Sequence, residues 1–305
     1  MKHVIIINPK AGVKNQVNKI ETTIKEKFKD LNYEIYITKS QNDAHNFVKN
    51  YNTNGKTRFY ACGGDGTLNE VASAAVDNDN AEVACYPIGS GNDFVKYFGK
   101  AEDFLDFKNL INGEVNKVDM IKYPENGIDH YAINIFNIGF DASVVVAQRK
   151  LKKLPLMTGK SAYSIGVATC LLKKMNYKCI IKVDGKEVYR GKMLLSAIAN
   201  GKCYGGGYYC APLADVSDGM LDLCAIKRIS RLKLAKFIKL YKAGKHLNNP
   251  KLEKYVIYHK GKEFEFEIEK PLFYSKDGES GKVNKYKLYV VSKCVNFVIP
   301  KIDNK

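Results

Sequence analysis

The chain has 305 residues, of which 45% are hydrophobic and 27% are charged. This length corresponds to one large or two medium-sized domains, and the 20 Tyr and 14 Phe residues supply enough apolar surface to exclude an intrinsically disordered protein. The formal net charge is +17, so the sequence predicts a polyanionic partner, which could be nucleic acid, an anionic membrane surface or a phosphorylated ligand.

The cysteines and the apolar runs indicate a reduced, cytoplasmic protein. The eight cysteines are scattered, with no C-x-x-C pair and no histidine at zinc-like spacing, so most of them should be small buried hydrophobic residues. The apolar run Val4–Ile7 is too short for a signal peptide, and nowhere do about 18 apolar residues follow one another. We therefore expect any membrane contact to be peripheral.

The first part of the chain, to about residue 122, alternates short apolar runs with helical stretches. Strands are predicted at Val4–Ile7, Tyr33–Thr38, Arg58–Cys62 and Glu82–Pro87, each followed by a helix. This alternation is typical of a parallel β-α domain. Such sheets bind ligands beyond the carboxyl ends of their strands.

From Tyr131 onward the pattern becomes β-rich, which predicts a largely antiparallel second domain. Two helices, Ser161–Lys174 and Arg231–Ala243, interrupt this pattern. The strands are expected at Tyr131–Ile138, Lys178–Val183, Leu194–Ala199, Leu221–Ile226, Glu263–Ile268 and Tyr286–Val291.

Two acidic glycine-rich turns follow successive strands. Gly63-Gly64-Asp65-Gly66-Thr67 precedes a helix, and Thr67 with Glu70 fits a capping box. Glycines at a helix N-terminus let backbone N–H groups approach a phosphate, whereas Asp65 would repel it unless a cation such as Mg²⁺ lies between them. The next strand ends in Gly89-Ser90-Gly91-Asn92-Asp93, where Ser90 and Asp93 again fit a cap and Asp93 could share the cation.

These turns, with Asn8-Pro9-Lys10-Ala11-Gly12 after the first strand, resemble the diacylglycerol kinase catalytic-domain family of lipid kinases. Further blocks resemble the family in the same order along the chain: Asn137–Asp141, Gly159–Tyr163, Asn200–Pro212, Asp218–Asp222 and Asp277–Glu279. The glycine motif alone is not specific, since NAD kinases and phosphofructokinases have similar loops, but the ordered set is. At two positions the chain departs from the family pattern, with Ala11 where Ser is more common and Ser90 where Thr is more common.

The resemblance implies a fold of the NAD kinase and diacylglycerol kinase type. An N-terminal Rossmann-like domain, residues 1–122, would bind the nucleotide, and a β-sandwich-like domain, residues 123–292, would bind the lipid. The active site would lie in the cleft between them. We also expect the C-terminal segment, about 293–305, to return to the first domain.

The resemblance also assigns the nucleotide and the catalytic metal. Asp65 and Asp93 would organise a catalytic Mg²⁺, and Asp119, which from sequence alone is only one strand-terminal carboxylate, would be a further functional acid. ATP would lie across a larger set: Asn8, Pro9, Lys10, Ala11, Gly12, Thr38, Gly63, Gly64, Asp65, Gly66, Thr67, Leu68, Asn69, Glu70 and Ser90.

Two Asp-containing turns carry the remaining assignments. Asp277-Gly278 in isolation is a common hairpin turn, but within the family pattern Glu279 is the general base that accepts the proton of the lipid hydroxyl. Spacing alone favours an ordinary turn at residues 215–220 as well. The resemblance there implies a structural Mg²⁺ held by Asp215, Asp218 and the Met220 carbonyl.

The positive charge is densest at Arg149–Pro155 and between Lys227 and Lys245. In the second region, Leu234, Phe237, Ile238 and Tyr241 recur at helical spacing among lysines, which predicts an amphipathic basic helix. This could be an ordinary solvated surface helix, or it could dock on an anionic bilayer.

The sequence therefore predicts an ATP- and Mg²⁺-dependent lipid kinase that converts diacylglycerol to phosphatidic acid in phospholipid metabolism. Its partners would be a membrane lipid and an anionic membrane surface rather than nucleic acid, and a homodimer is left open. Two alternatives remain: an NAD kinase-like enzyme with a soluble substrate, and a basic nucleic-acid-binding module, although no zinc finger, RNP motif or helix-turn-helix pattern supports the latter.

Overall fold

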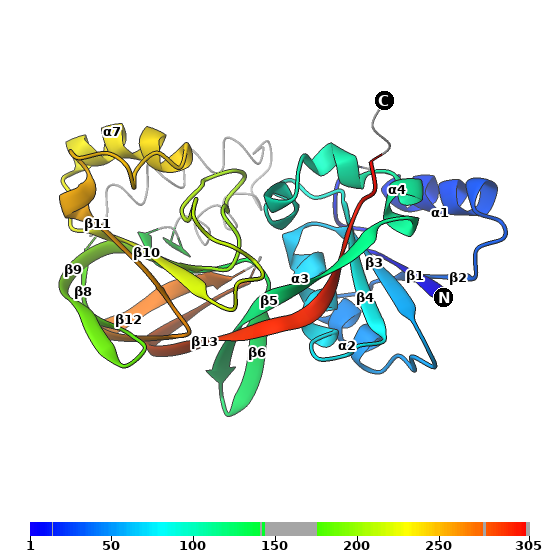
Figure 1. The fold of residues 1–305 in the computed structure, drawn as a ribbon, viewed down its shortest axis with the longest axis horizontal. Coiled ribbons are helices and arrows are strands. Elements are labelled where there is room, and N and C mark those ends of the chain that lie inside the picture. Colours follow the sequence, from blue (N-terminus) through cyan, green and yellow to red (C-terminus); the bar gives the residue numbers. More distant parts are fainter. Residues whose placement is uncertain (14, 141, 144–175, 277–278, 303–305) are drawn as a thin grey trace.

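The computed structural model describes residues 1–305 except 14, 141, 144–175, 277–278 and 303–305. The predicted helix Ser161–Lys174, the block Gly159–Tyr163 and the basic run Arg149–Pro155 lie outside the described residues. The described chain forms two lobes side by side, and the long strand β13 (Glu279–Ile299) passes from one lobe to the other (Figure 1).

The parallel lobe contains the first four strands. In the sheet their order is β2 (Tyr33–Ile37), β1 (Lys2–Ile7), β3 (Thr57–Gly63) and β4 (Ala81–Pro87), and each neighbouring pair is parallel, as the alternating pattern predicted. Two short 3-10 helices, Phe94–Tyr97 and Ala101–Phe104, come between β4 and α4. The lobe comprises β1 (Lys2–Ile7), α1 (Gln16–Lys27), β2 (Tyr33–Ile37), α2 (Asp43–Lys49), β3 (Thr57–Gly63), α3 (Asp65–Ala74), β4 (Ala81–Pro87) and α4 (Phe107–Ile111).

Neighbouring residues of β3 show that helical segments cover both faces of this sheet. Phe59 makes an edge contact with Tyr51, two residues beyond the end of α2, whereas Tyr60 packs against Phe107 of α4. Successive side chains of a strand point to opposite faces. A strand buried on both faces needs a continuous apolar run, and Val4–Ile7 of β1 is fully buried.

The antiparallel lobe is built from strands that pair with their neighbours in antiparallel register, as the β-rich pattern predicted. The helix α7 (Arg231–Lys242) covers one face, where Leu234, Phe237 and Tyr241 are buried. A 3-10 turn, Glu253–Tyr255, precedes β11. The strands are β6 (Ile128–Ala132), β7 (Ile135–Gly139), β8 (Tyr177–Val183), β9 (Lys186–Ala199), β10 (Leu221–Lys227), β11 (Val256–Gly261) and β12 (Glu263–Lys276).

The prediction of one strand at Tyr131–Ile138 is wrong, because two residues outside any strand separate β6 from β7. Between the two strands, buried Asn side chains form hydrogen bonds with the backbone of Ile133. The Ile133 N–H donates to Asn69 Oδ1 (2.9 Å), and the Ile133 carbonyl accepts from Asn200 Nδ2 (2.7 Å). These bonds replace the ladder that would continue the strand.

Two long strands join the lobes. β5 (Glu114–Glu125) pairs antiparallel with β13 (Glu279–Ile299) and contains the expected boundary at residues 122 and 123. The first half of β13 pairs with β12, and residues Asn296–Val298 add to the parallel sheet beside β4. Asp119, expected at the end of a strand, lies inside β5, and neither the full length of β5 nor β11 was among the predicted strands.

Candidate active site

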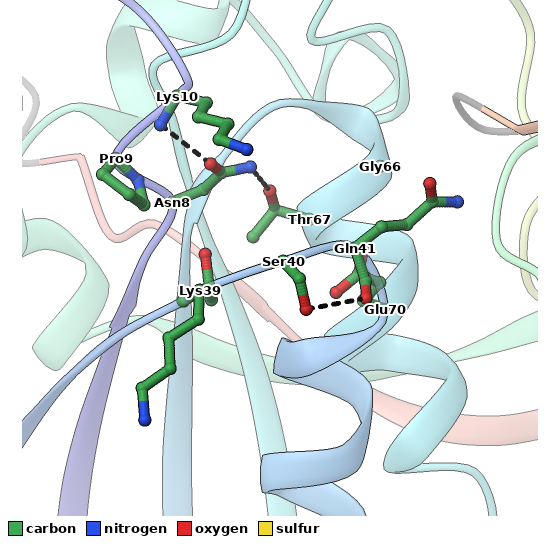
Figure 2. Close-up of a pocket in the computed structure, with 10 residues that line it drawn as sticks. Asn8, Pro9, Lys10, Lys39, Ser40, Gln41, Gly66, Thr67 and Glu70 are labelled. Atoms are coloured by element: carbon green, nitrogen blue, oxygen red, sulfur yellow. Dashed lines mark hydrogen bonds between the residues drawn. The ribbon is translucent and has the colours of Figure 1, made fainter.

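One cavity of about 250 Å³ lies at the carboxyl ends of β1, β2 and β3 (Figure 2). The sequence analysis had assigned seven of the lining residues to the nucleotide and missed Lys39, Ser40 and Gln41, which follow Thr38 in the turn after β2. Ala11, Gly12, Gly63, Gly64, Asp65, Leu68, Asn69 and Ser90 do not line it. The full lining is Asn8, Pro9, Lys10, Thr38, Lys39, Ser40, Gln41, Gly66, Thr67 and Glu70.

Asn8 holds two walls of the cavity together. Its Nδ2 donates to Thr67 Oγ1 (3.0 Å), and its Oδ1 accepts from the backbone N–H of Lys10 (3.0 Å). The turn after β1 is thereby tied to the first turn of α3. The positive end of that helix, together with Lys10 and Lys39 in the walls, favours an anionic ligand in the cavity.

The predicted capping box of Thr67 and Glu70 is wrong. The helix α3 begins at Asp65 with Gly64 as its N-cap and no side-chain cap, so Thr67 lies inside the first turn. Glu70 instead accepts hydrogen bonds from the backbone N–H groups of Asn42 (3.0 Å) and Ala44 (3.2 Å). Its carboxylate therefore caps α2 and fixes the turn that supplies Lys39, Ser40 and Gln41.

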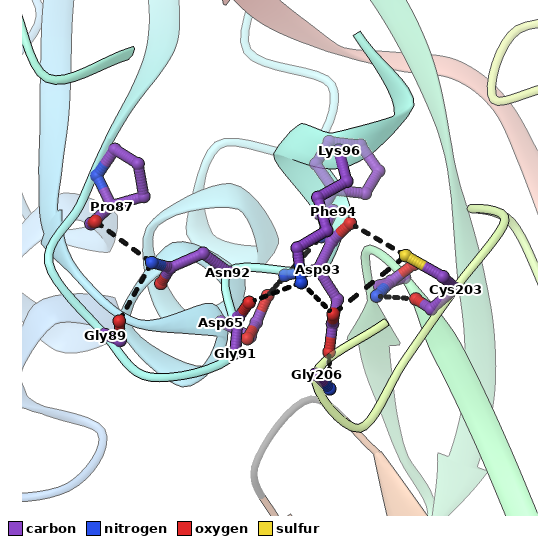
Figure 3. A network of polar contacts seen from close by, with 11 residues as sticks. Asp65, Pro87, Gly89, Gly91, Asn92, Asp93, Phe94, Lys96, Cys203 and Gly206 are labelled. Carbon is purple, nitrogen blue, oxygen red and sulfur yellow. Dashed lines mark hydrogen bonds and ion pairs between the residues drawn. The ribbon is translucent and has the colours of Figure 1, made fainter. Parts of the chain in front are cut away.

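Asp65 and Asp93 come together beside Gly91 (Figure 3). Asp65 Oδ1 accepts a hydrogen bond from the backbone N–H of Asp93 (2.6 Å). A Cβ atom on Gly91 would lie 2.7 Å from Asp65 Oδ2 and 3.4 Å from Asp93 Oδ2. Burial, and next the negative charge of Asp93, raise the pKa of Asp65 above its ordinary value.

Asp93 also connects the two lobes. Its carboxylate pairs with Lys96 Nζ (2.7 Å) and accepts a hydrogen bond from the backbone N–H of Gly206 (2.8 Å), which belongs to the antiparallel lobe (Figure 3). The predicted cap by Ser90 and Asp93 is wrong, because a 3-10 turn begins only at Phe94 and Ser90 is exposed. Sequence reasoning missed Lys96, three residues after Asp93.

Asp119 and Asn69 bind backbone rather than the cavity. Asp119 is fully buried, and its two oxygens accept hydrogen bonds from the backbone N–H groups of Lys293 (2.6 Å) and Gly219 (2.7 Å). Burial raises the pKa of Asp119, and these two hydrogen bonds oppose that effect. Asn69 holds the chain between β6 and β7, so both residues position neighbouring segments.

The loop expected to hold a structural metal contains a lysine contact. Asp218 Oδ1 accepts from the Met220 backbone N–H (3.0 Å), and Asp218 Oδ2 pairs with Lys260 Nζ (2.5 Å). Asp215 Oδ1 accepts from the Ser217 backbone N–H and hydroxyl, both at 2.9 Å. Among the residues that the structure describes, no three His, Cys, Asp or Glu side chains are grouped to hold a metal.

Glu279 begins β13, where its backbone pairs with Lys276. The Glu279 side chain, together with Asp277 and Gly278, lies outside the described part of the chain, so its role as the base stays a prediction. Seven of the eight cysteines lie within the described residues, and all seven are free and buried, as expected.

Models of two protein families match most of the chain. The model of the diacylglycerol kinase catalytic domain matches residues 2–123, and the model of the YegS C-terminal NAD kinase beta sandwich-like domain matches residues 134–298. The chain belongs to the diacylglycerol kinase and YegS-like family of lipid kinases. The predicted enzyme class, a phosphotransferase with a hydroxyl acceptor, is confirmed at the level of this family.

Individual relatives cover most of the lipid kinase chain. A diacylglycerol kinase of Bacillus subtilis is 27% identical over 97% of this chain and 96% of its own. A protein of Shewanella frigidimarina named "Probable lipid kinase YegS-like" is 30% identical over 78% of this chain and 75% of its own.

Solved structures share the fold of the lipid kinase chain. A diacylglycerol kinase from Bacillus anthracis has a TM-score of 0.69 at 21% identity and covers 97% of this chain and 96% of its own. An NAD kinase from Archaeoglobus fulgidus, solved in complex with ATP, has a TM-score of 0.51 at 13% identity and covers 98% of this chain and 94% of its own. In the described part of this chain, no helix is long and apolar enough to cross a membrane.

Proposed function

We propose that this lipid kinase transfers the γ-phosphate of ATP to the hydroxyl group of diacylglycerol and forms phosphatidic acid. The observation that carries the proposal is the cavity at the carboxyl edge of the parallel sheet, with Lys10, Lys39 and the start of α3 in its walls. This chemistry suits the phosphates of a nucleotide. The acid pair of Asp65 and Asp93 beside Gly91 completes the site.

The walls of the cavity orient the nucleotide. Asn8 and Glu70 fix the turns after β1 and β2 by hydrogen bonds, so the groups that contact ATP are positioned before it binds. Phosphoryl transfer is catalysed mainly by positioning and by neutralising charge on the transferred group. Rigid walls with two lysines meet both requirements.

The acid pair fits a divalent cation. Because Gly91 has no side chain, Asp65 Oδ2 and Asp93 Oδ2 can face the same space, and carboxylate oxygens are the ligands that Mg²⁺ prefers. Asp65 and Asp93 would hold the ion, and Mg²⁺, when bound, would neutralise charge on the phosphates.

In the reaction the acceptor hydroxyl loses its proton to Glu279 as its oxygen bonds to the γ-phosphorus. The bond from that phosphorus to the β,γ-bridging oxygen breaks, and ADP leaves. Glu279 is three residues after Lys276, the buried last residue of β12, and is its partner across the strand pair. Its place at the start of β13 supports the proposed role.

A panel of lipids tests the proposal. Purified protein, labelled ATP and Mg²⁺ are mixed with micelles containing diacylglycerol, phosphatidylglycerol, a sphingoid base or a prenol, and with NAD in a lipid-free arm. We expect diacylglycerol to be phosphorylated fastest, and Glu279→Gln to reduce the rate ~10²-fold or more. Exclusive phosphorylation of NAD, or a wild-type rate in Glu279→Gln, would refute the proposal.

We further propose that α7 holds the kinase against an anionic bilayer. Lys233 and Lys239 are exposed on this helix, and Leu234 and Phe237 anchor it to the lobe. Each basic residue near such a surface contributes ~1 kcal/mol. Sedimentation with phosphatidylserine vesicles should fall in the Lys233→Ala/Lys239→Ala variant and fall as salt rises, whereas the control Lys27→Ala/Lys29→Ala on the other lobe should bind like the wild type. Equal binding of both variants would contradict docking by α7.

A further inference from the structure

The loop between Ala214 and β10 gathers three carboxylates. Asp215 and Asp218 lie in the loop and Asp222 lies on β10, where its side chain is 1% exposed. Like charges in such proximity need a compensating cation, because neither burial nor repulsion favours the ionised form. The resemblance to lipid kinases implies Mg²⁺ on Asp215, Asp218 and the Met220 carbonyl.

The pairing of β10 with β11 places a lysine beside these carboxylates. Lys260 on β11 is the direct cross-strand partner of Asp222 on β10. Its Nζ lies 2.5 Å from Asp218 Oδ2 and 3.8 Å from Asp222 Oδ2. Register fixes which residues face one another across a sheet, so the ammonium group is held at the acids by the fold of the lobe.

The environment of the Asp222 carboxylate explains why a positive charge is needed beside it. Its Oδ1 accepts a hydrogen bond from the Tyr258 hydroxyl (2.6 Å), but its Oδ2 is buried and has no hydrogen-bond partner among the described residues. A buried carboxylate oxygen without a partner is costly. The positive group that faces this oxygen is the ammonium of Lys260.

Two other carboxylate oxygens of the loop, Asp215 Oδ1 and Asp218 Oδ1, are bound to protein donors. Asp215 Oδ1 accepts from Ser217 and from the Tyr97 hydroxyl (3.2 Å), and Asp218 Oδ1 accepts from the Met220 backbone N–H. Mg²⁺ demands near-octahedral coordination by oxygens and waters. The carboxylate oxygens as arranged suit an ammonium ion, whose three N–H groups donate to them, better than a hydrated divalent ion.

We propose that Lys260 is the built-in cation of this loop and takes the place of the structural Mg²⁺ that the resemblance implies. The loop then keeps its shape without a divalent metal. Because the loop binds Asp119 through Gly219 N–H and Val216 O, Lys260 is a positioning residue for the joint between the lobes. The inference does not depend on which lipid the kinase phosphorylates.

Thermal unfolding without nucleotide tests the proposal, and every chain in the test carries Asp65→Asn because Asp65 and Asp93 are themselves proposed to hold Mg²⁺. In this background, the chain that is otherwise wild type should show the same apparent Tm in EDTA and in millimolar Mg²⁺. Lys260→Met should lower the apparent Tm in EDTA by ~3 °C or more, and millimolar Mg²⁺ should restore part of that loss because the metal can enter once the ammonium is gone. Lys262→Met, at an exposed position just beyond β11, is the matched control and should behave like the wild type.

A second measurement keeps the proposal testable if Lys260→Met does not fold. In the same Asp65→Asn background without nucleotide, metal analysis and Mn²⁺ titration by electron paramagnetic resonance on the chain that keeps Lys260 should find no tightly bound equivalent, and Lys260→Arg should keep the Tm of that chain in EDTA. One equivalent of metal in that purified chain, or a Tm of that chain that falls in EDTA, would overturn the proposal. A Lys260→Met variant as stable as the wild type in EDTA would overturn it too.

Discussion

Two acid clusters of this lipid kinase each combine aspartates with one lysine but differ in how their charge is compensated. At the edge of the parallel sheet, Lys96 pairs with Asp93, while burial and the charge of Asp93 raise the pKa of Asp65. In the antiparallel lobe, Lys260 reaches both Asp218 and Asp222.

The difference indicates separate roles. In the first cluster Lys96 pairs with Asp93, and the charge of Asp93 still acts on Asp65, a repulsion that a catalytic metal could relieve. In the second cluster a single lysine reaches both Asp218 and Asp222, which suits a structural joint. The variants below test this distinction in order of expected effect.

The largest effect should come from Asp65→Asn. We expect ATP-dependent lipid phosphorylation to fall ~10³-fold, because the variant loses a charged ligand for Mg²⁺ where charge develops in the transition state. Initial rates with labelled ATP and diacylglycerol micelles measure this. Asp222→Asn is the matched control, and a loss there as large as in Asp65→Asn would remove the distinction between the clusters.

Gly91→Ala should have the next largest effect. The new Cβ would approach Asp65 Oδ2 at 2.7 Å and Asp93 Oδ2 at 3.4 Å, so it would push the carboxylates apart and narrow the space for a cation. We expect a ~10²-fold loss of kcat, and the Mg²⁺ concentration for half-maximal rate should rise. An unchanged rate and Mg²⁺ dependence would place the metal elsewhere.

Asp222→Asn should leave the rate within ~3-fold of wild type, because Asp222 lies on β10 in the second cluster. Burial raises the pKa of Asp222 to about 6, so removal of the charge should not lower the apparent Tm at pH 8. Steady-state kinetics and thermal unfolding at that pH measure both expectations. A strong loss of rate with an intact Tm would assign this carboxylate to catalysis.

The smallest effect is a pH dependence of stability. Since the pKa of Asp65 in the folded chain lies above its ordinary value of 3.8, the ionised group opposes folding, and that cost grows as pH rises from 3.8 through the raised pKa. Asp65→Asn should therefore raise the apparent Tm in EDTA at pH 8 by ~2–4 °C. This increase in Tm should disappear below pH ~4. An increase in Tm that did not change with pH would contradict a raised pKa of Asp65.

Much of the fold could be predicted from local pattern. The run Val4–Ile7 and the glycine turns after β3 and β4 gave the parallel strands and their ligand edge, because a strand buried on both faces needs continuous apolar residues. The strand β5 escaped prediction because Glu114–Lys117 are exposed and Val118–Ile121 are buried. A strand that is exposed in its first part and buried in its second shows no single hydrophobic periodicity.

Side-chain partners were less predictable than the turns that carry them. Thr67 and Glu70 have the spacing of a capping box, yet Asn8 binds Thr67 and the start of α2 binds Glu70. Asn8 and Thr67 are 59 positions apart, and local spacing contains no information about such pairs. The same holds for Lys260, which lies 42 positions from Asp218.

The sequence by itself determined the family, the parallel and antiparallel halves and the glycine turns at the ligand edge, because these depend on local periodicity and on residues that lie together in the chain. The tertiary structure alone decided that Asp93 joins the lobes through Gly206 and that Asp119 is fully bonded to backbone. It also decided that a lysine faces the loop expected to hold a metal. Those outcomes depend on strand register and on the packing of distant segments, which sequence spacing does not encode.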